Sequence, residues 1–214
     1  MKSHALLAAS ALATVLGACT PASAPPSDPA LPVATTAGAD ASTMDAGDSA
    51  QARAQAAAKA FSGSLRQQLQ ARLVEGGPVA AVEFCAVEAP KIAQAMQAEH
   101  RLRLGRVPVS GRARNPSNAP GDWQATVLAD FEARARAGEA ADSLALMQSA
   151  NLPEGMALRM ARGIAVEPGC LACHGKTVAE PVKAAIARHY PDDAATGFEV
   201  GDLRGLLWVE VPAP

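Results

Sequence analysis

Apolar residues recur every three or four positions after residue 50, which is the period of an amphipathic α-helix. A first helix is expected from Ala50 to about Val74, ending at Glu75-Gly76-Gly77. Pro78 favours the first turn of a second helix, which would continue to about Ala98 with a kink at Pro90. The body of the chain is therefore predicted to begin with helices.

A two-residue alternation of apolar and polar positions then appears, as expected for strands with one buried face. Asp122 can cap a helix that ends at Gly138, and the C-terminal stretch predicts a hairpin with a Gly-rich turn. Helices mixed with such strands predict the α+β class. The expected strands are Arg101–Ser110, Leu144–Met147 and Met156–Val166, a last helix is Val182–Tyr190, and the hairpin spans Gly197–Val211.

The first residues follow another pattern, in which Lys2 precedes an apolar run that ends at Leu16. This run is too short to span a bilayer and has the form of a secretory signal. Leu16-Gly17-Ala18-Cys19 resembles a bacterial lipobox, so residues 1–18 are predicted to be a lipoprotein signal peptide and Cys19 the lipidated residue. An ordinary signal peptide cut after Ala22-Ser23-Ala24 is the alternative, and it would give a soluble periplasmic protein.

Residues 19–50 are rich in Pro, Ala, Ser, Thr and Gly, and are expected to form a disordered linker. Residues 51–214 are then long enough for one domain. The lipobox implies a periplasm-facing lipoprotein of the bacterial envelope, attached to the membrane through Cys19. The absence of Asp at position 20 favours the outer membrane.

Charge is nearly balanced, with 19 Lys and Arg against 21 Asp and Glu, and aromatic residues make up 3% of the chain. Binding of single-stranded nucleic acid uses basic grooves interleaved with aromatic side chains. Nucleic acid is therefore not an expected partner.

Cys170-Leu171-Ala172-Cys173-His174 is the c-type haem attachment pattern C-x-x-C-H. Two thiols three residues apart fit on one helical turn and can form thioethers to the haem vinyl groups, while the adjacent imidazole reaches the iron. With four Cys and four His in 214 residues, chance would produce such a match roughly once in a thousand sequences. Haem c assembly outside the inner membrane agrees with the predicted export.

Two other kinds of site also use a C-x-x-C pair. A thioredoxin-type pair should follow a strand in a βαβ pattern, which is not seen. Zinc is the stronger rival, because Cys85 and His189 could complete a Cys₃His set with the motif and make a zinc-stabilised interaction domain.

Three further residues carry open alternatives. Cys85 lies on the apolar face of its predicted helix, where a buried, inert cysteine is one interpretation and a functional thiol the other. Arg112 and Arg114 stand in a turn-rich loop, either as solvated charges or as donors to the haem propionates.

Five spaced motifs occur along the body of the chain: Phe84-Cys85-x-x-x-Ala89-Pro90, Arg114-Asn115-Pro116-x-Asn118-x-Pro120, Cys170-Leu171-x-Cys173-His174-Gly175, Tyr190-Pro191-x-Asp193-Ala194 and Gly197-Phe198-x-x-Gly201-Asp202-x-Arg204-Gly205. Together they resemble a bacterial single-haem c-type cytochrome family with a PAS-like domain. The resemblance covers roughly residues 56–211, with one departure at Gly163-Ile164, where the family pattern has Pro-Ile.

The resemblance implies an antiparallel PAS-like sheet flanked by helices, and one covalent haem c per chain. It also implies that His174 is the proximal iron ligand and Cys85 the distal one. If Cys85 does not bind the iron, His189, His100 or a Met such as Met160 are the residues to test. Thiolate ligation stabilises ferric iron, so an electron carrier of low potential or a redox- or gas-responsive sensor is expected, acting on a redox or signalling protein partner. The alternative is a haem enzyme, a peroxidase or reductase with an openable distal site.

Overall fold

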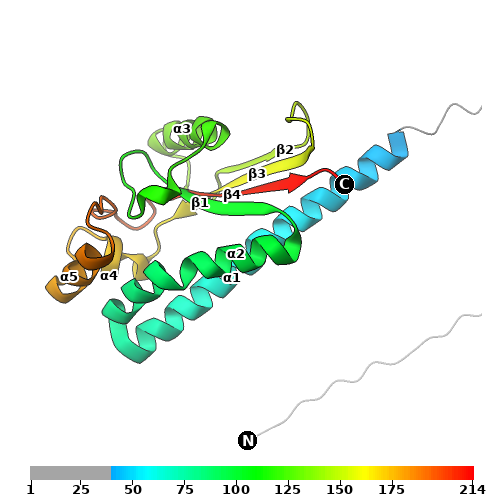
Figure 1. Ribbon diagram of the computed structural model, residues 1–214. Coiled ribbons are helices and arrows are strands. Elements are labelled where there is room, and N and C mark those ends of the chain that lie inside the picture. Colours follow the sequence, from blue (N-terminus) through cyan, green and yellow to red (C-terminus); the bar gives the residue numbers. More distant parts are fainter. Residues whose placement is uncertain (1–39) are drawn as a thin grey trace, which may run out of the picture. The chain divides into compact units, whose positions relative to one another are not determined.

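A long helix, α1 (Asp40–Val87), opens the part of the chain that the computed structural model describes, residues 40–214 (Figure 1). It consists of two helices joined at a kink, because Gly77 leaves helical geometry at φ 69° and ψ −167°, a conformation that glycine adopts almost alone. Helix α2 (Ala89–His100) follows with Pro90 in its first turn and packs against α1. The predicted helices and the break at Gly76-Gly77-Pro78 are confirmed, but α1 begins at Asp40, ahead of the expected start at Ala50.

Four antiparallel strands form one sheet in the order β1-β4-β3-β2. The three strands expected before the haem motif are confirmed within a few residues, and with the helices they confirm the α+β class. The strands are β1 (Arg103–Pro108), β2 (Ala145–Gln148), β3 (Met156–Ala165) and β4 (Leu203–Pro212).

Helices cover both faces of this sheet (Figure 1). In β4, Leu207, Val209 and Val211 belong to the cluster that packs against α1 and α2, whereas Leu206 belongs to the cluster under α3 (Asp122–Arg136). This division follows from the alternation of side chains along a strand. Helix α3 begins at Asp122 itself, and the capping position before it is Gly121, which makes no side-chain cap, so the expected cap by Asp122 is not formed.

Buried apolar residues form three clusters, named here by the helices they involve. The α1–α2 cluster includes Phe61, Phe84, Ile92, Leu158, Met160 and Val209. The α3 cluster includes Val107, Leu128, Phe131, Val166, Phe198 and Leu206. The α5 cluster contains Val82, Val178, Val182, Ala185 and Ile186, and it joins α5 (Glu180–His189) to α1.

The predicted C-terminal hairpin is wrong. Only β4 forms in this region, and both of its edges are already paired, with β1 on one side and β3 on the other. The preceding segment instead pairs with the haem motif: Gly197 and Phe198 donate backbone N–H groups to the carbonyl oxygens of Gly175 and His174, each at 2.9 Å. A strand with no free edge cannot accept a hairpin partner.

Gly163, the departure from the family pattern, lies within a continuous β3. Its N–H donates to the Leu144 carbonyl at 2.8 Å, a bond that proline could not make. A Cβ at this position would stand 2.1 Å from the Ala141 carbonyl oxygen. Glycine therefore lets the 141–144 turn approach the strand closely, and the only register shift nearby follows Ile164.

The predicted signal peptide (1–18), Cys19 and most of the predicted linker lie outside the described residues. Residues 40–50, which were expected to be disordered linker, instead belong to α1. Between residues 40 and 214 no helix combines the length and apolar character needed to cross a membrane.

Candidate functional site

The C-x-x-C-H motif follows β3 on two short turns, η2 (Pro168–Cys170) and α4 (Leu171–His174). Gly175 ends the second turn. Only glycine fits at this position, because a side chain there would stand 2.6 Å from the Leu171 carbonyl oxygen. Cys170 and Cys173 are free thiols one turn apart on this segment. The predicted local geometry of the motif is therefore confirmed.

His174 bonds to the protein through one of its two ring nitrogens. Its Nδ1 lies 2.7 Å from the carbonyl oxygen of Ala195, and since a carbonyl only accepts, Nδ1 must carry the proton. Burial, together with the positive charges of Arg114 and Arg204, lowers the pKa of His174 to about 3. The imidazole is thus neutral, with an unprotonated Nε2 lone pair suited to bind a metal ion.

Cys85 lies on the short segment of α1 that follows the kink, residues 78–87. Helix α1 contacts α4 and α5 (Figure 1). Cys85 packs partly buried against the α1–α2 cluster, while Cys173 packs against the α5 cluster, which holds Val82 one turn earlier on α1. Burial raises the pKa of the Cys85 thiol, the nearby Arg106 opposes that shift, and Cys173 adds to it. Cys85 is therefore a neighbour of the motif and of a cation.

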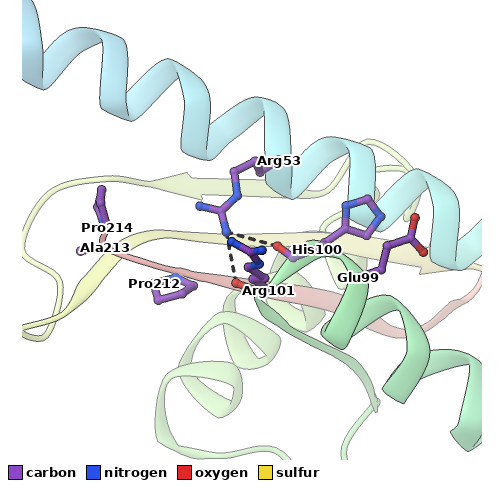
Figure 2. Close-up of a pocket in the computed structure, with 7 residues that line it drawn as sticks. All are labelled: Arg53, Glu99, His100, Arg101, Pro212, Ala213 and Pro214. Carbon is purple, nitrogen blue, oxygen red and sulfur yellow. Dashed lines mark hydrogen bonds between the residues drawn. The ribbon is translucent and has the colours of Figure 1, made fainter.

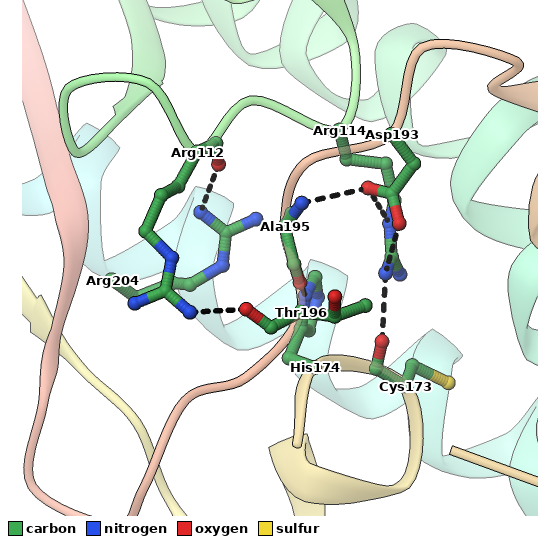
Figure 3. A network of polar contacts seen from close by, with 8 residues as sticks. All are labelled: Arg112, Arg114, Cys173, His174, Asp193, Ala195, Thr196 and Arg204. Carbon is green, nitrogen blue, oxygen red and sulfur yellow. Dashed lines mark hydrogen bonds and ion pairs between the residues drawn. The ribbon is translucent and has the colours of Figure 1, made fainter. Parts of the chain in front are cut away.

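Arg114 is committed to a buried ion pair. Its Nε and Nη2 donate to the two carboxylate oxygens of Asp193 at 3.0 and 3.2 Å, and the side chains are 12% and 9% exposed. The same Nη2 donates to the Cys173 carbonyl at 2.7 Å (Figure 3). Arg114 is therefore no solvated loop charge, since it ties the 111–120 loop to the motif.

Arg112 stacks on an aromatic ring. Its guanidinium carbon lies 3.4 Å from the centroid of Phe198, and its Nη2 donates to the Thr196 carbonyl. Phe198 in turn meets the His174 ring edge to face at 6.4 Å. The predicted role of Arg112 and Arg114 toward haem propionates stays a prediction, because the described contacts of both are with protein groups.

Two further arginines belong to this site that the sequence did not single out. Arg204 of β4 lies 5.0 Å from the Phe198 centroid, and burial with neighbouring cations lowers its pKa to about 10. Arg106 of β1 is partly exposed to solvent. Burial of its charged group nevertheless lowers its pKa, and the nearby Cys85 opposes that shift. The sequence signal that could have found Arg106 and Arg204 is the two-residue alternation of side chains along β1 and β4. These cations give the site a positive character suited to carboxylates.

The zinc alternative required Cys85 and His189 to join the two cysteines of the motif. His189 is exposed at the end of α5, where its ring packs against Tyr190 at 6.5 Å. Within residues 40–214, no three His, Cys, Asp or Glu side chains are placed to hold a metal ion. The Cys₃His set is therefore not assembled.

His100 lies elsewhere. It lines a pocket of about 500 Å³ at the end of α2, where Arg53 donates to the carbonyl oxygens of His100 and Arg101 at 3.2 and 3.1 Å (Figure 2). Met160 is buried in the α1–α2 cluster against which Cys85 packs. Of the three substitutes for Cys85, only Met160 belongs to the apolar cluster against which Cys85 packs. His100 lines the pocket at the end of α2, and His189 is exposed at the end of α5.

Comparison with known proteins adds two findings. The model of a family described as Tll0287-like matches residues 39–212. Among solved structures, the chain is 28% identical to that in the crystal structure of the cyanobacterial haem protein Tll0287, covering 71% of this chain and 92% of that one with a TM-score of 0.49. No curated protein sequence matches.

Proposed function

Since this chain belongs to the Tll0287-like family, whose namesake is described as a cyanobacterial haem protein, we propose that it is a monohaem c-type cytochrome. Cys170 and Cys173 are the thiols that form the thioethers, and His174 binds the iron through Nε2. Cys85 supplies the second axial ligand. The bound haem would supply a one-electron redox centre.

The donor set of the site supports this proposal. Haem c needs two thiols on one turn, a neutral imidazole with a free nitrogen, and surroundings that are apolar around the ring and cationic near the carboxylates. The first two needs are met by Cys170, Cys173 and His174. Apolar clusters border the motif, and in Figure 3 His174 lies between Arg112 and Arg204 on one side and Arg114 on the other.

One observation carries the proposal: Cys85, far from the motif in sequence, lies on the helix that contacts α4 and is within electrostatic range of Cys173 and Arg106, while the motif imidazole has its Nδ1 already bonded. Burial raises the pKa of the Cys85 thiol and Arg106 opposes that shift only in part, so in the proposed complex binding to the iron itself would displace the thiol proton. An axial thiolate stabilises ferric iron and lowers the reduction potential.

Two protein ligands leave no open position on the iron for oxygen or peroxide. A peroxidase or reductase needs such a position, so the placement of Cys85 favours electron transfer or sensing over catalysis. If a small molecule or reduction of the iron displaced Cys85, residues 78–87 of α1 would be released from the haem. Movement of this segment would be the conformational signal of a sensor. The proposed setting is the bacterial envelope, with the chain attached through Cys19 and serving a redox or signalling protein.

The test is expression with the haem c maturation machinery, followed by intact mass and optical spectra of both oxidation states. A mass increase of one haem and a c-type spectrum are expected, and Cys170→Ala/Cys173→Ala should lose the covalent haem. A colourless protein with the bare polypeptide mass, from cells in which another c-type cytochrome matures, would contradict the proposal.

A further inference from the structure

We propose that Asp193 and Arg114 are positioning residues for His174, acting through the backbone of Ala195 to set the hydrogen bond on the imidazole Nδ1. This inference rests on the proposed function, because the ligand that is positioned is the proposed axial ligand of the haem. Its test separates the two, as set out below.

Ala195 is held at both of its backbone polar groups. Its carbonyl oxygen accepts from His174 Nδ1 at 2.7 Å, and its N–H donates to Asp193 Oδ1 at 3.0 Å. Ala195 itself is fully buried and its side chain is a methyl group, so only the backbone can orient the carbonyl. Asp193 therefore fixes the direction from which the imidazole proton is bound.

Asp193 is fixed in turn by Arg114. The ion pair is bidentate, with Arg114 Nε 3.0 Å from Asp193 Oδ1 and Arg114 Nη2 3.2 Å from Asp193 Oδ2. Two such hydrogen bonds fix the plane of the carboxylate as well as its position. Arg114 also donates to the Cys173 carbonyl at 2.7 Å. Because Cys173 and His174 are joined by a peptide bond, these contacts close a ring of hydrogen bonds around the proposed ligand (Figure 3).

The environment makes this ring strong. Both side chains of the ion pair are nearly buried, at 12% and 9% exposure, so water competes little for their hydrogen bonds. A histidine whose second nitrogen donates to an oriented acceptor is a stronger and better fixed metal ligand. Weakening that hydrogen bond makes the imidazole a poorer donor to ferric iron, and the reduction potential rises.

Charge alone predicts a different result, and this makes the inference testable. Removing the negative charge of Asp193 near the iron would raise the reduction potential, and removing the positive charge of Arg114 would lower it. Positioning predicts that both changes raise it, because each one breaks the same ring.

The experiment compares the haem-loaded full chain with D193N, R114Q and the double variant, by spectroelectrochemistry and by electron paramagnetic resonance of the ferric state. Both single variants should shift the potential in the positive direction, with altered ferric g-values, and the double variant should match a single one. The control is R134Q, which breaks an ion pair with Glu139 on the surface of α3 and should leave both readouts unchanged.

Opposite shifts for D193N and R114Q, additive shifts in the double variant, or unchanged potentials would overturn the inference. Should D193N fail to fold, R114K serves instead, because lysine keeps the charge but not the two-pronged geometry, and a wild-type potential in R114K would overturn it equally. Covalent haem is verified by mass in every variant. A wild type without haem refutes the proposed function, whereas haem-loaded variants with wild-type potentials refute the positioning role alone.

Discussion

Cys85 and His174 show what single side chains contribute to the proposed haem site. Burial is the main influence on the pKa of each, raising that of Cys85 and lowering that of His174, and cations from distant parts of the chain act as well: Arg106 opposes the shift of Cys85, and Arg114 and Arg204 add to that of His174. As a result, Cys85 is a thiol within electrostatic range of a cation, and His174 is a neutral imidazole. Changes at these two positions therefore give the most direct predictions.

We expect Cys85→Ser to keep the covalent haem, since Cys170 and Cys173 are untouched, but to lose the thiolate-ligated ferric spectrum. The reduction potential should rise, on the order of 100 mV, because an axial ligand that favours ferric iron is gone. Optical titration of the haem-loaded protein measures both effects.

The matched control is Val87→Ser, which changes an exposed residue two positions further along the same helix. It should behave as wild type. An unchanged ferric spectrum in Cys85→Ser would assign the second axial position to another ligand, of which Met160 is the first to test.

The pKa of about 3 at His174 predicts a pH dependence of the haem-free chain. The unfolded imidazole titrates near 6.5, so the unfolded chain takes up the proton first as the pH falls. Stability should therefore decline between about pH 6.5 and pH 3, and be free of this penalty above pH 6.5. Urea unfolding at several pH values measures the slope.

His174→Gln should flatten that slope, because glutamine does not titrate and its amide can still donate to Ala195. His189→Gln removes an exposed histidine and should leave the slope as in wild type. Equal slopes in wild type and His174→Gln would show that the imidazole is protonated equally in both states.

At the scale of elements, the break in α1 decides where Cys85 lies. Gly77 adopts φ 69° and ψ −167°, and Pro78 starts the segment that carries Val82 and Cys85 toward α4 and α5. Without the break, the helix would continue on its own period, and the apolar face of residues 78–87 would point in another direction.

Gly77→Ala should therefore destabilise the protein by about 1–3 kcal/mol, because alanine has no comfortable conformation there. Apart from its chain neighbours and the backbone of its own helix, no atom lies within 4 Å of the added methyl group, so the substitution tests the backbone conformation. Denaturant unfolding gives the magnitude, and the ferric spectrum of the haem-loaded variant reports on Cys85.

Gly63→Ala is the control in the same helix. The site is exposed, helical and open, so alanine should stabilise the protein by up to about 1 kcal/mol. A Gly77→Ala variant as stable as wild type would mean that the break does not depend on the glycine conformation.

At the scale of the whole molecule, the three apolar clusters meet at the motif. Cys85 packs on the α1–α2 cluster, Cys170 on the α3 cluster and Cys173 on the α5 cluster. A haem bonded to Cys170 and Cys173 and bound by His174 and Cys85 would connect all three. Folding and haem binding should then be coupled.

The haem-loaded protein should accordingly unfold about 10 °C above the haem-free chain, as expected for a few kcal/mol of ligand-linked stability in a chain of this size. Differential scanning calorimetry of both forms measures the difference. Haem-loaded Cys85→Ser should show a smaller gain, because the link to the α1–α2 cluster is lost. Identical midpoints for the two forms would contradict the coupling.

The sequence by itself determined the features that depend on neighbours along the chain. The C-x-x-C-H turn, the break at Gly77-Pro78 and the alternation in β3 are local, since a few adjacent residues set their backbone geometry. For the same reason Cys170, Cys173 and His174 could be assigned to one turn before any tertiary contact was known.

Only the tertiary structure decided which distant segments meet. The partner of Arg114 is Asp193, 79 positions away, and His174 takes its acceptor from the 193–198 segment, part of which local patterns had assigned to a hairpin. That assignment failed because β4 lies between β1 and β3, and no local pattern encodes a strand's place in the sheet. Long-range pairing thus brought Cys85, Arg106 and Arg204 to the motif, because their neighbours are set by packing and not by sequence separation.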